Sequence, residues 1–308
     1  MAKKKQAIPK KAARKTYELQ RVNFPSGSGG CEADLYIPKG RGNHPVVVMA
    51  HGFGAERSFR LPAFADRFAE AGIAVLLFDY RSFGDSPGEP RNLISPRMHN
   101  EDWKAALQFV RRMPGLDSQR IALWGTSFSG GHIVNIAPEE KPAALSLLVP
   151  FSDGFRTLFN YSAAFVLQAV FHGLWDLLLS LFGRSHNVPI IGKPEEFALL
   201  NTAECWEGYG GIVDKESAWQ NSAPARICLT LPMYRPVAKA SRIKCPVIIV
   251  AGEQDSLCPL PLVQTLARKI RGSMMMLLST GHFEPYSGRA FEETVRAQLQ
   301  FFRQCFVR

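Results

Sequence analysis

The stretch that decides the fold is Arg120-Ile-Ala-Leu-Trp-Gly-Thr-Ser-Phe-Ser-Gly-Gly-His132. It contains an uninterrupted apolar run from Ile121 to Trp124, which is typical of a strand covered on both faces. Ser127 follows in the pattern Gly-x-Ser-x-Ser, and its small neighbours permit a sharp, strained turn. The pattern predicts a strand, a turn and a helix. Such a turn would raise the Ser127 hydroxyl above the sheet edge, with the free N–H groups of the helix N-terminus behind it.

The rest of the chain alternates strands with helices. The strands are predicted at 17–24, 31–37, 44–50, 73–78, 145–149, 246–251 and 274–278. Helices are predicted from Leu61 to Gly72, from an N-cap at Asn100 to Gly115, and near both 262–270 and 291–302. This alternation predicts a mainly parallel α/β sheet with right-handed crossovers. Sites in such sheets lie at the carboxyl ends of strands, where His51-Gly-Phe-Gly54, Asp79-Tyr-Arg81 and Ser127 all fall.

The strand–helix alternation stops between residues 154 and 241. An apolar stretch from Phe155 to Phe182 carries Gln168, His172 and Asp176 at four-residue spacing, which aligns them on one face of a helix. We expect this polar stripe to face solvent, and a pocket-lining role is the alternative. A membrane span is disfavoured because Asp176 would be costly in lipid. The sequence predicts a helical cap insertion at 154–241 between two parts of one core, 17–153 and 242–308.

Composition excludes several classes of protein. The chain has 308 residues, 46% of them hydrophobic, and a formal net charge of +10. Seven of those ten charges lie in residues 1–15, so we predict a basic disordered tail at 1–16 and no nucleic-acid partner for the mildly basic remainder. Six scattered cysteines without a C-x-x-C pair predict free thiols and a cytoplasmic protein. Zinc spacing and phosphate-binding glycine motifs are missing, so we predict no metal and no cofactor.

The strand-end residues suggest nucleophilic catalysis. A serine hydroxyl needs a base within hydrogen-bond reach, and His282 directly follows the last predicted strand. The imidazole in turn needs a carboxylate, for which Asp255 at the end of the neighbouring strand is the first candidate and Asp153 the alternative. An oxyanion would need two N–H donors, and the N–H of Phe128, directly after Ser127, is one of them.

The segment around Ser127 resembles the nucleophile elbow of the α/β-hydrolase superfamily, with Ser129 in place of the usual last glycine. The chain order Ser127, Asp255, His282 is similar to that of the family. The resemblance implies an α/β-hydrolase fold, with the Phe53 N–H as second oxyanion donor. The runs from His51 to Ser58 and from Phe78 to Ser86 resemble the dienelactone-hydrolase-like and acyl-peptidase-like branch. Dienelactone hydrolases proper use cysteine where Ser127 stands.

These observations predict a serine hydrolase of the carboxylesterase or thioesterase type. It would cleave carboxylic ester or thioester bonds through an acyl-enzyme on Ser127, with hydrophobic acyl substrates favoured by the apolar insertion. An acyl or polyketide transferase using the same acyl-enzyme is the alternative, followed by a peptidase and a non-catalytic binding protein. The expected partner is a small-molecule ester or thioester substrate. We expect no stable insertion of the chain into a membrane. Homo-oligomerisation stays open.

Overall fold

The computed structural model describes residues 15–307, so most of the predicted basic tail lies outside the described residues. Its centre is an eight-stranded sheet with the order β1-β2-β4-β3-β5-β6-β9-β10. These strands are β1 (Tyr17–Ser26), β2 (Gly29–Pro38), β3 (His44–Ala50), β4 (Ala74–Phe78), β5 (Leu116–Thr126), β6 (Ala144–Leu148), β9 (Val247–Gly252) and β10 (Met274–Leu278). β1 and β2 form an antiparallel hairpin, and β2 pairs antiparallel with β4. All pairs from β4 to β10 are parallel, as predicted.

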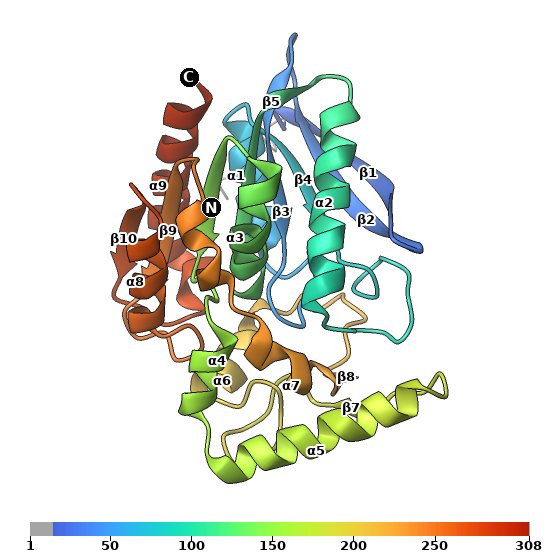
Figure 1. The fold of residues 1–308 in the computed structure, drawn as a ribbon. Coiled ribbons are helices and arrows are strands. Elements are labelled where there is room, and N and C mark those ends of the chain that lie inside the picture. Colours follow the sequence, from blue (N-terminus) through green and yellow to red (C-terminus); the bar gives the residue numbers. More distant parts are fainter. Residues whose placement is uncertain (1–14, 308) are drawn as a thin grey trace, which may run out of the picture.

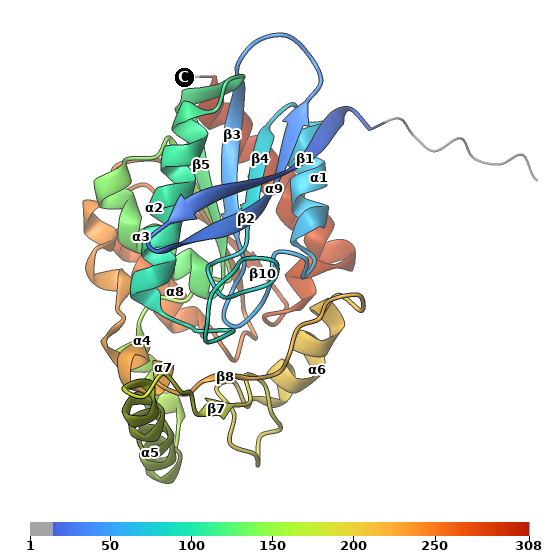
Figure 2. The same ribbon diagram turned by 90° about the vertical axis from the view of Figure 1, so that its right-hand side faces the viewer.

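Helices cover both faces of this sheet (Figure 1, Figure 2). They are α1 (Leu61–Glu70), α2 (Pro96–Arg112), α3 (Phe128–Glu140), α8 (Leu260–Lys269) and α9 (Gly288–Phe306). α2 and α3 pack together on one face, and α1 and α9 pack together on the other. Because both faces are covered, every residue of β4, β6 and β9 is buried, which explains their uninterrupted apolar sequences.

One predicted helix boundary is wrong. α2 begins at Pro96, four residues before the predicted N-cap at Asn100. Ser95 is the N-cap, and its side chain accepts a hydrogen bond from the backbone N–H of Met98. Proline at the first helical position loses no hydrogen bond because that N–H has no partner within the helix. Asn100 therefore lies inside the helix.

The segment between β6 and β9, called the cap segment here (residues 154–241), lies beyond the carboxyl end of the sheet (Figure 1). Its main elements are α4 (Gly154–Thr157), α5 (Ala163–Ser180), β7 (Asn187–Val188), α6 (Ala203–Ile212), β8 (Ala223–Pro224) and α7 (Ile227–Thr230). Single 3-10 turns fill some connections: η1 (Leu158–Asn160), η2 (Leu231–Met233), η3 (Pro236–Ala238), η4 (Ala240–Arg242) and, after β10, η5 (Glu284–Tyr286).

The polar stripe of α5 does not face solvent as a unit, contrary to expectation. Asp176 is fully buried and accepts hydrogen bonds from the Arg226 side chain and from two backbone N–H groups. His172 is half-buried and hydrogen-bonds His186 over 2.8 Å. Only Gln168 is exposed. A buried carboxylate is tolerated when paired, and here the pairing fastens α5 to the rest of the cap segment.

Candidate active site

Ser127 occupies the turn between β5 and α3 in a strained backbone conformation. Its φ of 52° and ψ of −122° are outside the usual regions for a residue with a Cβ. The turn is held on both sides, because the Ser127 N–H donates to the Leu148 carbonyl and the Ser127 carbonyl accepts from the Phe151 N–H, each over 2.9 Å. The side chain is thus raised above the carboxyl end of the sheet, as the sequence predicted.

Small neighbours make this turn sterically feasible. A Cβ on Gly125 would stand 2.6 Å from the Ser129 carbonyl oxygen, and one on Gly52 would stand 3.1 Å from the Ser127 Cβ. Ser129, where the family motif has glycine, fits because its hydroxyl points away from the substrate side. It is fully buried, and its Oγ accepts a 3.0 Å hydrogen bond from the Tyr80 hydroxyl.

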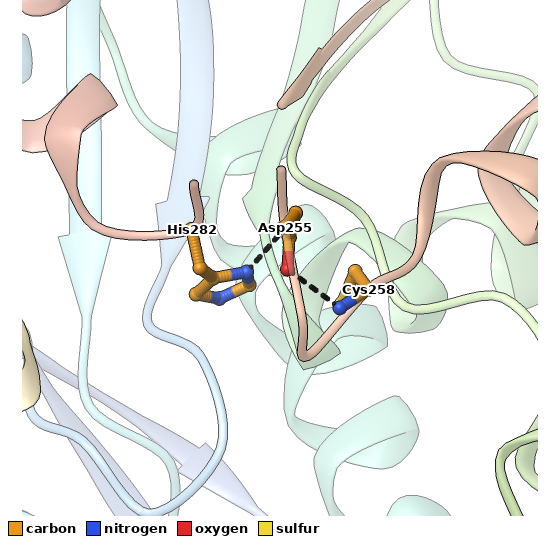
Figure 3. A group of neighbouring side chains, drawn as sticks. All are labelled: Asp255, Cys258 and His282. Atoms are coloured by element: carbon orange, nitrogen blue, oxygen red, sulfur yellow. Dashed lines mark hydrogen bonds and ion pairs between the residues drawn. The ribbon is translucent and has the colours of Figure 1, made fainter. Parts of the chain in front are cut away.

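The loops after β9 and β10 bring Asp255 and His282 together (Figure 3). His282 Nδ1 lies 2.7 Å from Asp255 Oδ2. The other carboxylate oxygen, Oδ1, accepts the backbone N–H groups of Leu257 and Cys258 over 2.9 and 2.7 Å. Both oxygens of Asp255 are therefore held by hydrogen bonds, and the Nδ1 hydrogen bond leaves Nε2 as the nitrogen available to a substrate or nucleophile.

The carboxylates around His282 favour its protonated form. Burial is the largest single effect and lowers the pKa of His282. The charge and hydrogen bond of Asp255, together with the charges of Glu204 and Glu284, outweigh it, so the pKa lies above its usual value. A raised pKa makes the imidazole a stronger base toward a hydroxyl proton.

A third side chain, Cys258, lies beside Asp255 and His282 (Figure 3). Burial raises the pKa of its thiol well above the usual value, so the thiol is protonated. The Ser127 side chain opposes this shift and lowers the pKa of the thiol by a smaller amount. Within residues 15–307 no direct hydrogen bond joins Ser127 to His282. Catalytic hydrogen bonds often form only when substrate is bound. The ligand atoms of Asp255, Cys258 and His282 lie within 4.8 Å of one another, which would suit a metal ion, but the mutual hydrogen bond already uses one atom each of Asp255 and His282.

The loop after β3 approaches the elbow from the other side. The rings of Phe53 and Phe128 pack edge-to-face with centroids 5.2 Å apart. Phe128 is the first residue of α3, so its N–H belongs to the N-terminal donors that lack a partner within the helix. Two cap side chains hold the carbonyls of the Phe53 loop: the Tyr209 hydroxyl donates to Phe53 O over 2.9 Å, and the Trp219 indole donates to Gly54 O over 2.7 Å.

Core and cap residues together enclose a pocket of about 370 Å³ over Ser127. Ser127 and His282 line it from the core, and Thr157, Phe165 and Tyr209 line it from the cap segment. A substrate in this pocket would contact both parts of the chain.

The other charged residues at the strand ends have structural partners. Asp153, the alternative acid, caps α4 by accepting two backbone N–H groups and pairs with Arg235 over 2.9 and 3.0 Å. Asp79 pairs with the buried Arg57, and Arg81 pairs with the buried Asp102. These ion pairs fix the loops that surround the site.

Sequence reasoning predicted a cap insertion but missed which of its residues contact the site. Tyr209, Trp219 and Glu204 all contact the catalytic loops, although they lie in a segment without a recognisable motif. Cys258 carried the only available signal, because it stands three residues after Asp255 in the same strand-end loop.

The parallel sheet, the strained serine turn and the hydrogen-bonded histidine define an α/β hydrolase. The chain belongs to the alpha/beta hydrolase family, whose model matches residues 47–297. It is 37% identical to quorum-quenching protein AidA of Acinetobacter baumannii over 285 residues, which cover 92% of this chain and 94% of that protein. It is 42% identical to thiohydrolase aneE of Aspergillus aculeatus, covering 87% of each chain. Polyketide transferase af380 of Aspergillus fumigatus is 26% identical, covering 92% of this chain and 97% of its own.

Proposed function

We propose that this hydrolase cleaves carboxylic ester or thioester bonds through an acyl-enzyme on Ser127. The observation that carries the proposal is the Asp255–His282 hydrogen bond beside a pocket that also exposes the strained Ser127. A serine, a base and a carboxylate that orients the base are what acyl transfer requires. The similarity to a thiohydrolase supports a thioester or ester substrate. Membership of the dienelactone-hydrolase-like branch stays a prediction.

The proposed reaction has two halves. Ser127 Oγ attacks the acyl carbon while its proton passes to His282 Nε2, and the N–H groups of Phe53 and Phe128 bind the resulting oxyanion. When the bond to the alcohol or thiol breaks, His282 protonates the leaving group. Water then attacks the acyl-enzyme, giving its proton to His282, and that proton returns to Ser127 as the acid leaves. Asp255 stabilises the imidazolium in both halves.

A second cavity supports an apolar acyl group. It has a volume of about 230 Å³ and lies between α4, α5 and α7, with Val166, Ala169 and Leu229 among its apolar lining. Phe53 and Phe165 line both cavities, so the second one adjoins the catalytic pocket. An acyl chain whose carbonyl lies beside Phe53 could therefore extend from the catalytic pocket into this apolar cavity.

Chain-length preference tests this assignment. Ala169→Phe should fill the second cavity and lower kcat/KM for p-nitrophenyl decanoate much more than for p-nitrophenyl butyrate. Ala164→Phe, on the exposed side of the same helix, serves as the matched control. Equal losses for both esters in Ala169→Phe would place the acyl chain elsewhere.

An acyl or polyketide transferase is the second candidate, favoured by the similarity to polyketide transferase af380. The acyl-enzyme would be the same, but an alcohol or amine would take the place of water. Adding a competing nucleophile during turnover separates the two functions. A transferase yields the new ester or amide as the main product at millimolar acceptor, whereas a hydrolase yields the free acid.

Fluorophosphonate labelling with intact-mass detection tests the nucleophile. Wild type should gain one adduct and Ser127→Ala none. Cys258→Ala is the matched control, since Cys258 is another nucleophilic side chain that lines the pocket, and it should keep the adduct. An adduct that survives in Ser127→Ala would end the proposal.

A further inference from the structure

One carboxylate of the cap segment touches both loops that carry Asp255 and His282. Glu204 lies in the first turn of α6. Its Oε1 accepts the backbone N–H of His282, and its Oε2 accepts the backbone N–H of Ser256 over 2.8 Å together with the Ser256 hydroxyl. Ser256 directly follows Asp255, so Glu204 bridges the two loops beside the residues that must stay aligned.

Gly281 allows the Glu204 carboxylate to come close to the backbone of the His282 loop. A Cβ on Gly281 would collide with Glu204 Oε1, so glycine at this position lets the carboxylate reach the His282 N–H. Thr202, the N-cap of α6, holds the same helix end by accepting the Cys205 N–H, and it also hydrogen-bonds the Ser256 hydroxyl over 3.1 Å. Charge-assisted hydrogen bonds of this kind are stronger than neutral ones.

We propose that Glu204 is a positioning residue that aligns Asp255 with His282 and couples the placement of the cap segment to catalysis. The proposal rests on the proposed function. Beyond its hydrogen bonds, the Glu204 charge acts on His282 together with Asp255 and Glu284, while the Cys258 thiol beside them is uncharged. Two roles can therefore be tested separately: the geometry of the loops and the charge near the imidazole.

Glu204→Gln tests both roles. Its amide can accept only one of the two backbone N–H groups, and its NH₂ group faces the other. We expect kcat to fall by about tenfold to a hundredfold, as for other small misalignments, with KM changed by less than about twofold. The acid limb of kcat/KM should also move to lower pH because a negative charge near His282 is lost. Glu207→Gln, exposed on the same helix, is the matched control and should behave as wild type.

A conservative variant separates alignment from misfolding. Glu204→Asp keeps the charge but shortens the side chain, so kcat should fall while the acid limb stays at the wild-type pH. Thermal unfolding of each variant shows whether the fold persists under assay conditions. Wild-type kcat and acid limb in Glu204→Gln would overturn the inference. Failure of the proposed function would appear separately, as missing fluorophosphonate labelling of wild-type Ser127.

A different observation concerns the outer face of α5. The α5 face, taken to include the two residues that follow the helix, exposes eight large apolar side chains by 46% or more: Leu167, Phe171, Leu174, Trp175, Leu177, Leu178, Leu181 and Phe182. The inner side instead holds Gly173, which packs closely on Leu229, and the buried Asp176. Figure 1 shows α5 running along the outside of the cap segment. The helix therefore buries its carboxylate and leaves its apolar residues open, the reverse of an ordinary surface helix.

The spacing of these side chains suits another helix. Leu167, Phe171, Leu174, Leu178 and Leu181 follow at alternating steps of four and three residues, the repeat of helices that pack side by side. At roughly 200 Å² for each fully exposed large apolar side chain, the α5 face offers on the order of 1,000 Å². That upper limit is comparable with the roughly 800 Å² that each partner buries in a standard stable interface.

We propose that a second copy of this chain covers the α5 face, with two α5 helices antiparallel across a two-fold axis. α5 is also long and apolar enough to cross a membrane by length and composition. However, the Asp176–Arg226 ion pair binds it along the cap segment. Its sequence also has no lysine or arginine, which helices lying at membrane surfaces use to bind lipid headgroups.

Light scattering coupled to size exclusion tests this interface. Wild type should elute as a dimer at micromolar concentration, and Leu174→Glu should be a monomer that keeps esterase activity. Leu19→Glu, at a 50% exposed leucine of β1, should stay dimeric. Leu174→Cys should form an intermolecular disulfide under mild oxidation. A monomeric wild type, or flotation of wild type with phosphatidylcholine vesicles that Leu174→Glu abolishes, would overturn the proposal.

Discussion

Replacing Ser129 by the glycine of the family motif should destabilise this protein. The Tyr80 hydroxyl accepts a 2.9 Å hydrogen bond from the Trp103 indole and donates its own proton to Ser129 Oγ. All three side chains are fully buried. Ser129→Gly removes the acceptor and leaves a buried hydroxyl proton without a partner.

The magnitude follows from two costs. An unsatisfied buried donor costs about 1–3 kcal/mol, and glycine in a helix adds up to about 1 kcal/mol. The free energy of unfolding should therefore fall by about 1–4 kcal/mol. For a large domain this corresponds to a Tm lower by about 2–10 °C.

Thermal unfolding followed by circular dichroism measures this effect. Ser129→Ala loses the hydrogen bond but keeps the Cβ, so its Tm should lie between those of wild type and Ser129→Gly. Ester hydrolysis at 25 °C should persist in both variants, because Ser129 does not line the catalytic pocket. A Ser129→Gly protein as stable as wild type would refute the reasoning that the Tyr80 contact explains the departure from the motif.

Two further predictions concern charge. The proposed activity needs neutral His282, whose pKa is raised, so kcat/KM should decline as the pH falls through a value above about 6.5. Asp255→Asn should shift this acid limb of the pH profile to lower pH and reduce kcat. An acid limb below about pH 6 in wild type would contradict the assignment of His282 as the base. Asp176→Asn leaves the Arg226 guanidinium without its counter-charge. In urea titration the free energy of unfolding should fall by about 3 kcal/mol. Limited proteolysis should then cleave first in α5. Unchanged stability would show that the ion pair contributes little.

The core was predictable because its signals are local. Buried strands such as β4 and β9 are apolar throughout, and each ends where a chemically distinctive residue follows. The elbow at Ser127 combines small residues with a strand–helix change, which one stretch of sequence can carry. The order of the strands in the sheet and the exact start of α2 depend instead on tertiary packing, which no short window records.

The cap was not predictable in the same way. The hydrogen bond from Tyr209 to the Phe53 carbonyl spans 156 positions, and that from His282 to Glu204 spans 78. Such contacts leave no spacing that a reader of the sequence could recognise. The polar stripe on α5 did leave a signal, because four-residue spacing places Gln168, His172 and Asp176 on one helix face. That spacing could not show that Arg226 pairs with Asp176 and that this carboxylate is buried.

The cap contacts connect the loops of the proposed catalytic residues to α6 and the segment that follows it. Tyr209 and Trp219 hold the loop that presents the Phe53 N–H, and Glu204 holds the loops of Asp255 and His282. All three lie within α6 and the connection that follows it. Moving α6 away from the core would therefore release both the loop of the proposed oxyanion donor Phe53 and the loop of the proposed base His282. If the proposed roles of these residues hold, the cap segment completes the catalytic geometry, and deleting it to widen the pocket would also remove activity.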